Sequence, residues 1–130
     1  VEISFLPSLP WVTGIFCILF IMWFINLYNF MDGCDGLATS IGIAGAGLIA
    51  VISLIQGNIN LALIYIVLAY ALGGFLVFNW APAKVFMGDA GAYFLGYVFG
   101  SLALISKMYY SSSLYVHLII FGCFVVDATW

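Results

Sequence analysis

The stretch "LATSIGIAGAGLIAVISLI", Leu37 to Ile55, carries no charged residue and consists mainly of apolar and small side chains. A helix needs about 20 such residues to cross roughly 30 Å of hydrocarbon. This run therefore has the length and composition of a transmembrane helix. The whole chain is similar, because 67% of its 130 residues are hydrophobic and only 5% are charged, unlike the usage of soluble domains. The sequence predicts an all-α, polytopic integral membrane protein.

Four further apolar runs of comparable length accompany this one, which predicts about five transmembrane helices in a single transmembrane domain over residues 1–130. The predicted helices cover residues 11–28, 37–55, 59–78, 90–106 and 114–130. Residues with turn-forming chemistry separate the runs. Because the chain starts with Val and its last apolar run has no charged flank, we expect it to be a fragment of a larger helical bundle.

The charged residues are few and mainly acidic. Five acids against two lysines give a net charge of −3 with no basic patch, which excludes a nucleic-acid partner. The three cysteines show no paired spacing, so the sequence predicts neither a disulfide framework nor a zinc site.

Most of the acidic residues are predicted to gather on one side of the membrane. Each crossing reverses the chain, so the first and third loops share a side, together with the end of the fifth predicted helix. Asp32, Asp35, Lys84, Asp89 and Asp127 lie in these places. A carboxylate at mid-helix costs roughly 2.5–3.5 kcal/mol, which also favours helix ends. One lysine lies on each side, so the positive-inside rule leaves the orientation open.

The segment "NLYNFMDGCDGLA", Asn26 to Ala38, concentrates polar residues in an otherwise apolar chain. Asn26 and Asn29 can share a face near the end of the first helix, while two glycines permit a tight turn that redirects Asp32 and Asp35. This arrangement predicts a polar pocket at the membrane surface, where such clusters usually serve a site. The alternative is that the aspartates only cap the following helix and complement its dipole.

The segment "NWAPAKVFMGDAGAYFLG", Asn79 to Gly96, places Asp89 between two glycines at the start of the fourth predicted helix. A helix N-terminus favours anions. Mg²⁺ takes one or two carboxylates together with water and substrate phosphates, so Asp89 with Asp32 or Asp35 is a candidate site for a cation and a diphosphate. Alternatively, Asp89 is only an N-cap. Lys84 could neutralise phosphate, although a lysine beside a tryptophan more often anchors a protein at the membrane interface.

Other small and polar residues are predicted to serve packing. Small residues recur every fourth position in the fourth predicted helix, at Gly88, Ala92, Gly96 and Gly100, and such a stripe lets a neighbouring helix approach closely. His117 is expected to be structural, because no titratable group is predicted near it.

Together the two motifs resemble those of the polyprenyl-phosphate N-acetylhexosamine-1-phosphate transferases, an integral membrane family that includes the enzymes initiating O-antigen and teichoic acid synthesis. "NLYNFMDGCDGLA" is similar to the family's Asn-rich DGxDGLA segment, and "KVFMGDAGAYFLG" is similar to its F-M-G-D-x-G segment. Their order and their separation by one helical hairpin also fit. Details such as "YNFMDG" look closer to the O-antigen-initiating, lipopolysaccharide branch than to the peptidoglycan branch.

This resemblance implies an enzyme that transfers N-acetylhexosamine-1-phosphate from a UDP-sugar to undecaprenyl or another polyprenyl phosphate and releases UMP. Mg²⁺ is the implied cofactor, with Mn²⁺ as an alternative. Asp32, Asp35 and Asp89 are then the catalytic residues, and Asp89 and Asp32 are the metal ligands. The residues expected to bind or shape the substrate site are Asn26, Asn29, Asn79 and Lys84.

The resemblance also implies a cellular location and an orientation. It places the protein in the bacterial inner membrane with its active face toward the cytoplasm, and it allows the protein to form a homodimer. The family's aspartate pair on an earlier loop and its His-containing loop after the last helix do not occur in this sequence. We therefore expect the fragment to be inactive alone.

Two other classes compete with this hypothesis. A CDP-alcohol phosphatidyltransferase also uses DG motifs in a membrane, but its pattern requires an arginine and this chain contains none. A transporter or channel could use Asp32, Asp35 and Asp89 for a permeating cation, but such groups usually lie near the bilayer midplane. The depth of the three carboxylates distinguishes a transporter from the transferase.

Overall fold

The computed structural model describes residues 10–110, 114–122 and 126, and within them it is all-α with no strand. The elements are α1 (Pro10–Met31), α2 (Leu37–Ile55), α3 (Ile59–Asn79), α4 (Gly88–Tyr109) and α5 (Leu114–Ile120). The first four are long and apolar enough to cross a membrane. This confirms the all-α, multi-pass prediction. The predicted fifth crossing extends to residue 130, and most of its second half lies outside the described residues.

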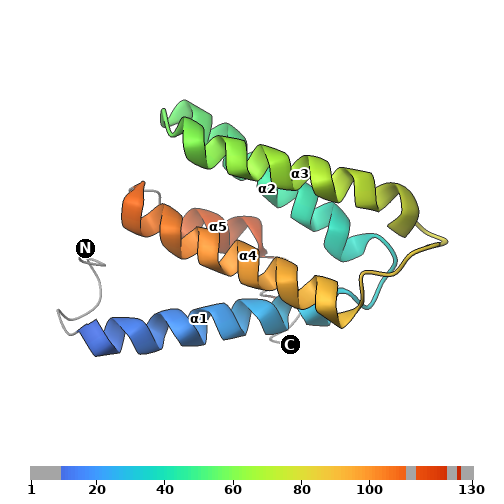
Figure 1. The fold of residues 1–130 in the computed structure, drawn as a ribbon, viewed down its shortest axis with the longest axis horizontal. Helices are drawn as coiled ribbons and strands as arrows, with labels where there is room; N and C mark the ends of the chain where they lie inside the picture. The colour runs from blue at the N-terminus through green and yellow to red at the C-terminus, as the bar shows by residue number, and fades with distance from the viewer. Residues whose placement is uncertain (1–9, 111–113, 123–125, 127–130) are drawn as a thin grey trace.

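The helices form two antiparallel pairs, α2 with α3 and α1 with α4, and α5 contacts α2 and α4 (Figure 1). Sequence neighbours α1 and α2 barely touch, so the first loop crosses from one pair to the other. At one end of the bundle the α1–α2 and α3–α4 loops lie side by side (Figure 1). At the other end, the Asn58 side chain donates a hydrogen bond to the Tyr110 carbonyl at 3.4 Å. The predicted sidedness of the loops is therefore confirmed.

Glycines allow α1 and α4 to pack with their backbones close together. A Cβ atom placed on Gly96 would lie 2.6 Å from the Ile25 Cα, and one on Gly100 would lie 3.0 Å from the Phe24 Cβ. Without a hydrophobic driving force between helices in lipid, such close van der Waals contact is a main source of association. The predicted small-residue stripe is confirmed as a packing surface at these two positions.

An aromatic cluster joins the two pairs. The Phe121 ring lies 4.8 Å from that of Phe99 and 5.5 Å from that of Phe24, measured between centroids, and Tyr28 stacks on Phe99 at 5.6 Å. The Tyr28 hydroxyl also donates a hydrogen bond to the Ala38 carbonyl at 2.9 Å. Tyr28 thus connects the end of α1 to the start of α2, on either side of the loop that carries Asp32 and Asp35.

Two helix boundaries differ from the prediction where they matter for the site. Helix α1 continues to Met31, so Asn29 is helical, and α4 begins at Gly88, so Asp89 lies in its first turn. Polar residues at a helix end are compatible with the helix as long as their side chains reach water or a partner. A hydropathy pattern therefore marks the apolar part of a helix and misses polar turns at its ends, here the last turn of α1 and the first turn of α4.

Candidate functional site

The two polar loops meet through a hydrogen bond between residues distant in sequence. The Ala83 backbone N–H donates to Asp35 Oδ2 at 3.0 Å. Beside this bond, Gly36 has a φ of +72° and packs against the end of α3, where a Cβ atom would lie 3.4 Å from the Asn79 carbonyl oxygen. A glycine suits this position because it adopts a positive φ without strain and leaves room for the neighbouring backbone. The loop therefore turns sharply and presents Asp35 to the third loop.

Asp32 and Asp89 form the acidic centre of the site. Burial raises the pKa of the Asp32 carboxyl above its usual value, a hydrogen bond from the Gly88 backbone lowers it, and the charge of Asp89 raises it. An electrostatic contribution from Asp89 and a bond from the adjacent Gly88 mean that the start of α4 lies next to Asp32. The structure thus brings together Asp32 from the first loop and Asp89 from the fourth helix, as the sequence predicted.

The capping alternatives are wrong for both helices. The N-cap of α2 is Gly36 and the N-cap of α4 is Met87, and neither helix has a side-chain capping hydrogen bond. Asp35 instead accepts its bond from Ala83 in the other loop. Asp89 lies in the first turn of α4, where its charge complements the helix dipole. Neither aspartate is therefore explained by capping.

Asn79 is buried at the end of α3, with 3% of its surface exposed. Its Oδ1 accepts a hydrogen bond from the Thr39 hydroxyl at 2.7 Å, and its Nδ2 donates to the Val85 carbonyl at 3.1 Å. Both ends of the amide thus contact protein groups. Of the two roles expected for Asn79, contacting the substrate or shaping its pocket, these bonds fit the second.

The other three predicted site residues are Asn26 and Asn29 of α1 and Lys84 of the third loop. Asn26 is exposed on α1 and donates a hydrogen bond to the Met22 carbonyl of its own helix at 3.1 Å. Asn29 is partly buried in the last turn of α1, and the side chain of Lys84 is exposed on the third loop. No described contact joins Asn26 or the Lys84 side chain to the aspartates. Asp127, the fourth predicted acidic residue of this side, lies outside the described part of the chain.

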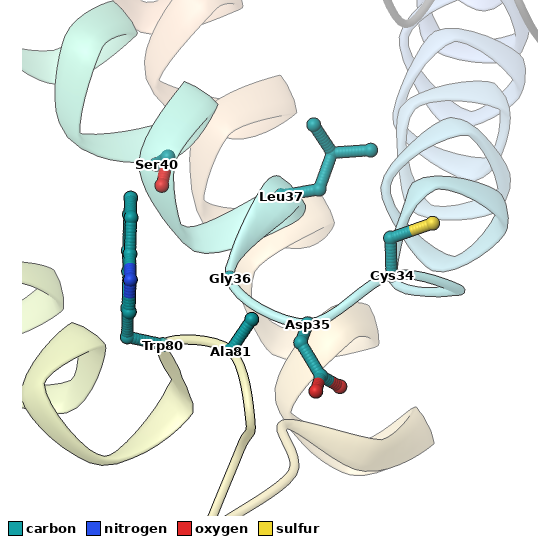
Figure 2. Close-up of a pocket in the computed structure, with 7 residues that line it drawn as sticks. All are labelled: Cys34, Asp35, Gly36, Leu37, Ser40, Trp80 and Ala81. Carbon is teal, nitrogen blue, oxygen red and sulfur yellow. The ribbon is translucent and has the colours of Figure 1, made fainter.

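An open pocket of about 460 Å³ lies between the start of α2 and the end of α3. Figure 2 shows the Trp80 indole and Ser40 on one side of it and Asp35 on the other. An exposed aromatic ring beside a carboxylate and a hydroxyl can stack on a flat ligand group and bind its polar edge. Trp80 is the tryptophan beside Lys84 that was expected only to mark the membrane interface. No role was expected for Ser40, which follows the DGxDGLA motif by two residues.

The acidic centre offers carboxylate oxygens, from Asp32 and Asp89, to a metal ion. Among the described residues, no three His, Cys, Asp or Glu side chains are grouped as a metal centre. The pair Asp32 and Asp89 nevertheless fits Mg²⁺, which commonly takes one or two carboxylates and completes its shell with water and substrate phosphate. Cys34 is exposed in the same loop, but a thiolate is a poor ligand for a hard cation. The donor set is therefore suited to Mg²⁺ or Mn²⁺ and unsuited to zinc.

All three aspartates lie at one end of the four long helices. Asp32 and Asp35 lie in the loop after α1, and Asp89 is the second residue of α4. None of them interrupts a helix at mid-length. By the criterion of carboxylate depth, this placement disfavours the transporter hypothesis.

Comparison with known proteins connects this site with one family. Residues 2–107 match the model of glycosyl transferase family 4. A phospho-N-acetylmuramoyl-pentapeptide-transferase of Clostridium novyi is 45% identical over 102 residues, which cover 75% of this chain and 31% of the relative. A probable undecaprenyl-phosphate N-acetylglucosaminyl 1-phosphate transferase of Bacillus subtilis is 36% identical over 126 residues, which cover 95% of this chain and 35% of the relative.

These matches have a defined extent. The chain spans about a third of the length of the curated relatives it matches. No solved structure matches the chain with significance. The relatives are bacterial, and with the four long apolar helices they support a bacterial multi-pass membrane protein.

Proposed function

The chain belongs to glycosyl transferase family 4, and from this membership we propose that its protein transfers N-acetylhexosamine-1-phosphate from a UDP-sugar to a polyprenyl phosphate and releases UMP. The observation that carries the proposal is the meeting of Asp32 and Asp89 at one end of the helices, next to Asp35. Both substrates are polyanions, so their reaction needs charge stabilisation more than it needs a protein nucleophile.

In this proposal, an oxygen of the lipid phosphate attacks the β-phosphorus of the UDP-sugar. A new oxygen–phosphorus bond forms, the bond from the β-phosphorus to the bridging oxygen breaks, and UMP leaves with that oxygen. A bound Mg²⁺ would neutralise the diphosphate and stabilise the leaving UMP.

The chain's own residues have separate roles in this proposal. Asp32 and Asp89 would hold the cation. Burial raises the pKa of the Asp32 carboxyl above its usual value, and the nearby charge of Asp89 adds to this rise. The pocket of Trp80, Ser40 and Asp35 has a flat aromatic wall and polar groups that suit the nucleoside. Asn29 borders the acidic loop, and Lys84 supplies the positive charge of the third loop.

The acceptor lipid needs apolar surface close to the acidic centre. An apolar groove of about 160 Å³ opens between α3 and the first turns of α4, lined by Leu72, Phe75, Met87, Gly91 and Leu95. Gly91 is one of its lining residues and lies two positions after Asp89. An isoprenoid chain in this groove would have its phosphate near the start of α4. This supports a polyprenyl phosphate as the acceptor.

The most specific parts of the proposal are the identity of the sugar and the cellular location. Relatives named for an N-acetylmuramoyl-pentapeptide donor and for an N-acetylglucosaminyl donor both match this chain. On the motif details alone, we favour N-acetylglucosamine as the sugar and O-antigen initiation as the pathway step. We place the protein in the bacterial inner membrane, with the acidic loops facing the cytoplasm. A screen of UDP-N-acetylglucosamine against UDP-N-acetylmuramoyl-pentapeptide with the intact protein would distinguish the two donors.

The proposal is tested on the full-length protein reconstituted in membranes with a UDP-N-acetylhexosamine, undecaprenyl phosphate and Mg²⁺. We expect Asp89→Asn to abolish Mg²⁺-dependent UMP release, because only one carboxylate of the pair remains. Lys107→Gln, which removes one charge in the last turn of α4 at the opposite end, should keep wild-type turnover. Wild-type turnover in Asp89→Asn would remove Asp89 from the metal role, and no UMP release by the wild type with either donor would refute the proposed reaction.

A further inference from the structure

A relay of two hydrogen bonds, the first buried and the second partly buried, connects the start of α2 to the loop before α4. Thr39, which is fully buried in the first turn of α2, donates from its hydroxyl to Asn79 Oδ1 at 2.7 Å. Asn79 Nδ2 then donates to the Val85 carbonyl at 3.1 Å. Thr39 and Val85 are thus linked through one amide at the end of α3. No motif in the sequence assigned a role to Thr39.

The Val85 carbonyl, which can only accept, fixes which way the Asn79 amide points, and the Thr39 hydroxyl donates to the amide oxygen that then faces α2. An amide has an oxygen that only accepts and a nitrogen that only donates. With the hydroxyl as donor, the oxygen faces α2 and the nitrogen faces the Val85 carbonyl. If the amide turned over, its oxygen would face that carbonyl, and two acceptors would oppose each other. The relay therefore requires a donor at position 39.

The relay holds the part of the chain that brings Asp89 to Asp32. Val85 precedes Gly88 by three residues, and Gly88 provides the backbone hydrogen bond to the Asp32 carboxylate. A second link between the loops, from the Ala83 N–H to Asp35, is exposed to water. The Thr39–Asn79 bond is buried, and buried polar bonds are stronger than exposed ones and costly to leave unmade.

From these contacts we propose that Thr39 is a positioning residue, which anchors the Asn79 amide by donating to its oxygen, so that the loop before α4 holds Asp89 at the right distance from Asp32. The inference rests on the proposed function for its activity readout. Thr39 itself does not touch substrate or metal in this proposal. Its effect on the reaction passes through the Asn79 amide, the Val85 carbonyl and the start of α4.

The experiment compares variants of the intact, membrane-reconstituted protein in the UMP-release assay over a range of Mg²⁺ concentrations. Thr39→Val keeps the volume and loses the donor, whereas Thr39→Ser keeps the donor and loses a methyl group. Ser53→Ala is the matched control, because Ser53 is a second buried hydroxyl residue of α2, near its other end. Thermal unfolding is measured for each variant, so that a loss of stability is separated from a loss of geometry.

We expect Thr39→Val to lower kcat/KM by about tenfold to a hundredfold, because a small misplacement of catalytic groups produces an effect of this size. The same variant should raise the Mg²⁺ concentration needed for the half-maximal rate. Thr39→Ser should restore both values to near wild type, and Ser53→Ala should leave both unchanged. A purely structural role for Thr39 would lower thermal stability without moving the Mg²⁺ requirement.

Either of two results would overturn the role of Thr39 while leaving the proposed function intact, provided that the wild type is active. The first is a Thr39→Val variant whose Mg²⁺ requirement is unchanged. The second is a Thr39→Ser variant that is as impaired as Thr39→Val. If Thr39→Val does not fold, Asn79→Asp replaces it, because an aspartate accepts from Thr39 but cannot donate to Val85. An unchanged Mg²⁺ requirement in Asn79→Asp would equally refute the relay. An inactive wild type would refute the proposed function instead.

Discussion

The Tyr65 hydroxyl and the Nε2 atom of His117 lie 2.9 Å apart, and both side chains are fully buried. Their hydrogen bond joins α3 to α5, and the Ser106 hydroxyl on α4 lies 3.4 Å from the same nitrogen. The expectation that no titratable group lies near His117 was wrong, because Tyr65 contacts it. The sequence pattern missed this contact, since the two residues are 52 positions apart in sequence. The expectation that His117 is structural agrees with its contacts to two other helices, α3 and α4.

This junction predicts a specific loss of stability. Tyr65→Phe removes one partner of a buried hydrogen bond and keeps the ring, so we expect the free energy of unfolding to fall by about 1–3 kcal/mol. The measurement is thermal or denaturant unfolding in detergent. Tyr70→Phe on the same helix is the control, since Tyr70 is 80% exposed, and it should have little effect. Equal effects of the two substitutions would show that the bond contributes nothing measurable.

The close approach of α1 and α4 predicts that even one methyl group at Gly96 is too large. Gly96→Ala places a Cβ atom within 2.6 Å of the Ile25 Cα and within 3.0 Å of the Phe24 carbonyl oxygen. Because these atoms belong to the backbone, the helices must separate, and we expect a loss of about 1–3 kcal/mol in the free energy of unfolding.

Gly47 provides the matched control for this substitution. It is also a helical glycine, but nothing lies within 4 Å of the place where its Cβ atom would be. Gly47→Ala should therefore keep or slightly raise the stability, because alanine favours a helix over glycine by up to about 1 kcal/mol. If Gly96→Ala were as stable as Gly47→Ala in the same unfolding experiment, the α1–α4 contact would be looser than described.

The environment of Asp32 predicts a pH dependence of stability in the metal-free protein. Burial and the charge of Asp89 raise the pKa of the Asp32 carboxyl group, and the hydrogen bond from the Gly88 backbone lowers it by less than they raise it. A carboxyl group with a higher pKa in the folded state binds its proton more tightly when folded. The free energy of unfolding should therefore fall as the pH rises from the ordinary carboxyl pKa of about 4 to the raised pKa of Asp32, and should level off above it.

Unfolding measured with a chelator present, across this pH range, checks the prediction. Asp32→Asn should remove the contribution, because the amide does not titrate. Asp89→Asn should narrow the pH range over which stability falls, since the charge that raises the pKa of Asp32 is gone. A slope that is the same in Asp32→Asn and in the wild type would place the titrating group elsewhere.

Much of the fold was predictable from the sequence because the bilayer imposes a simple length rule. The run Leu37–Ile55 was predicted to the residue, and α1, α3 and α4 differ only at their ends. Parity of the crossings then placed Asp32, Asp35 and Asp89 on one side. The ends of α1 and α4 were missed, because their last polar turns carry no hydropathy signal.

Which residues touch could not be read from the sequence. Sequence order suggests that α1 packs against α2, whereas α1 packs against α4, since the glycines that admit a close neighbour lie on α4. Ala83, Thr39 and Trp80 have no unusual chemistry in the sequence, and they became part of the site only through their contacts with Asp35, with Asn79 and with the pocket.

The sequence by itself determined that this protein is a helical membrane protein with most of its carboxylates at one surface, because hydrophobic length and the cost of buried charge are properties of the chain and the bilayer. Only the tertiary structure decided that Asp32 lies beside Asp89, that Asp35 binds the third loop and that Asn79 accepts a hydrogen bond from Thr39. These relationships depend on how helices distant in sequence pack, and that packing is set by the shapes of facing surfaces, which no local pattern records.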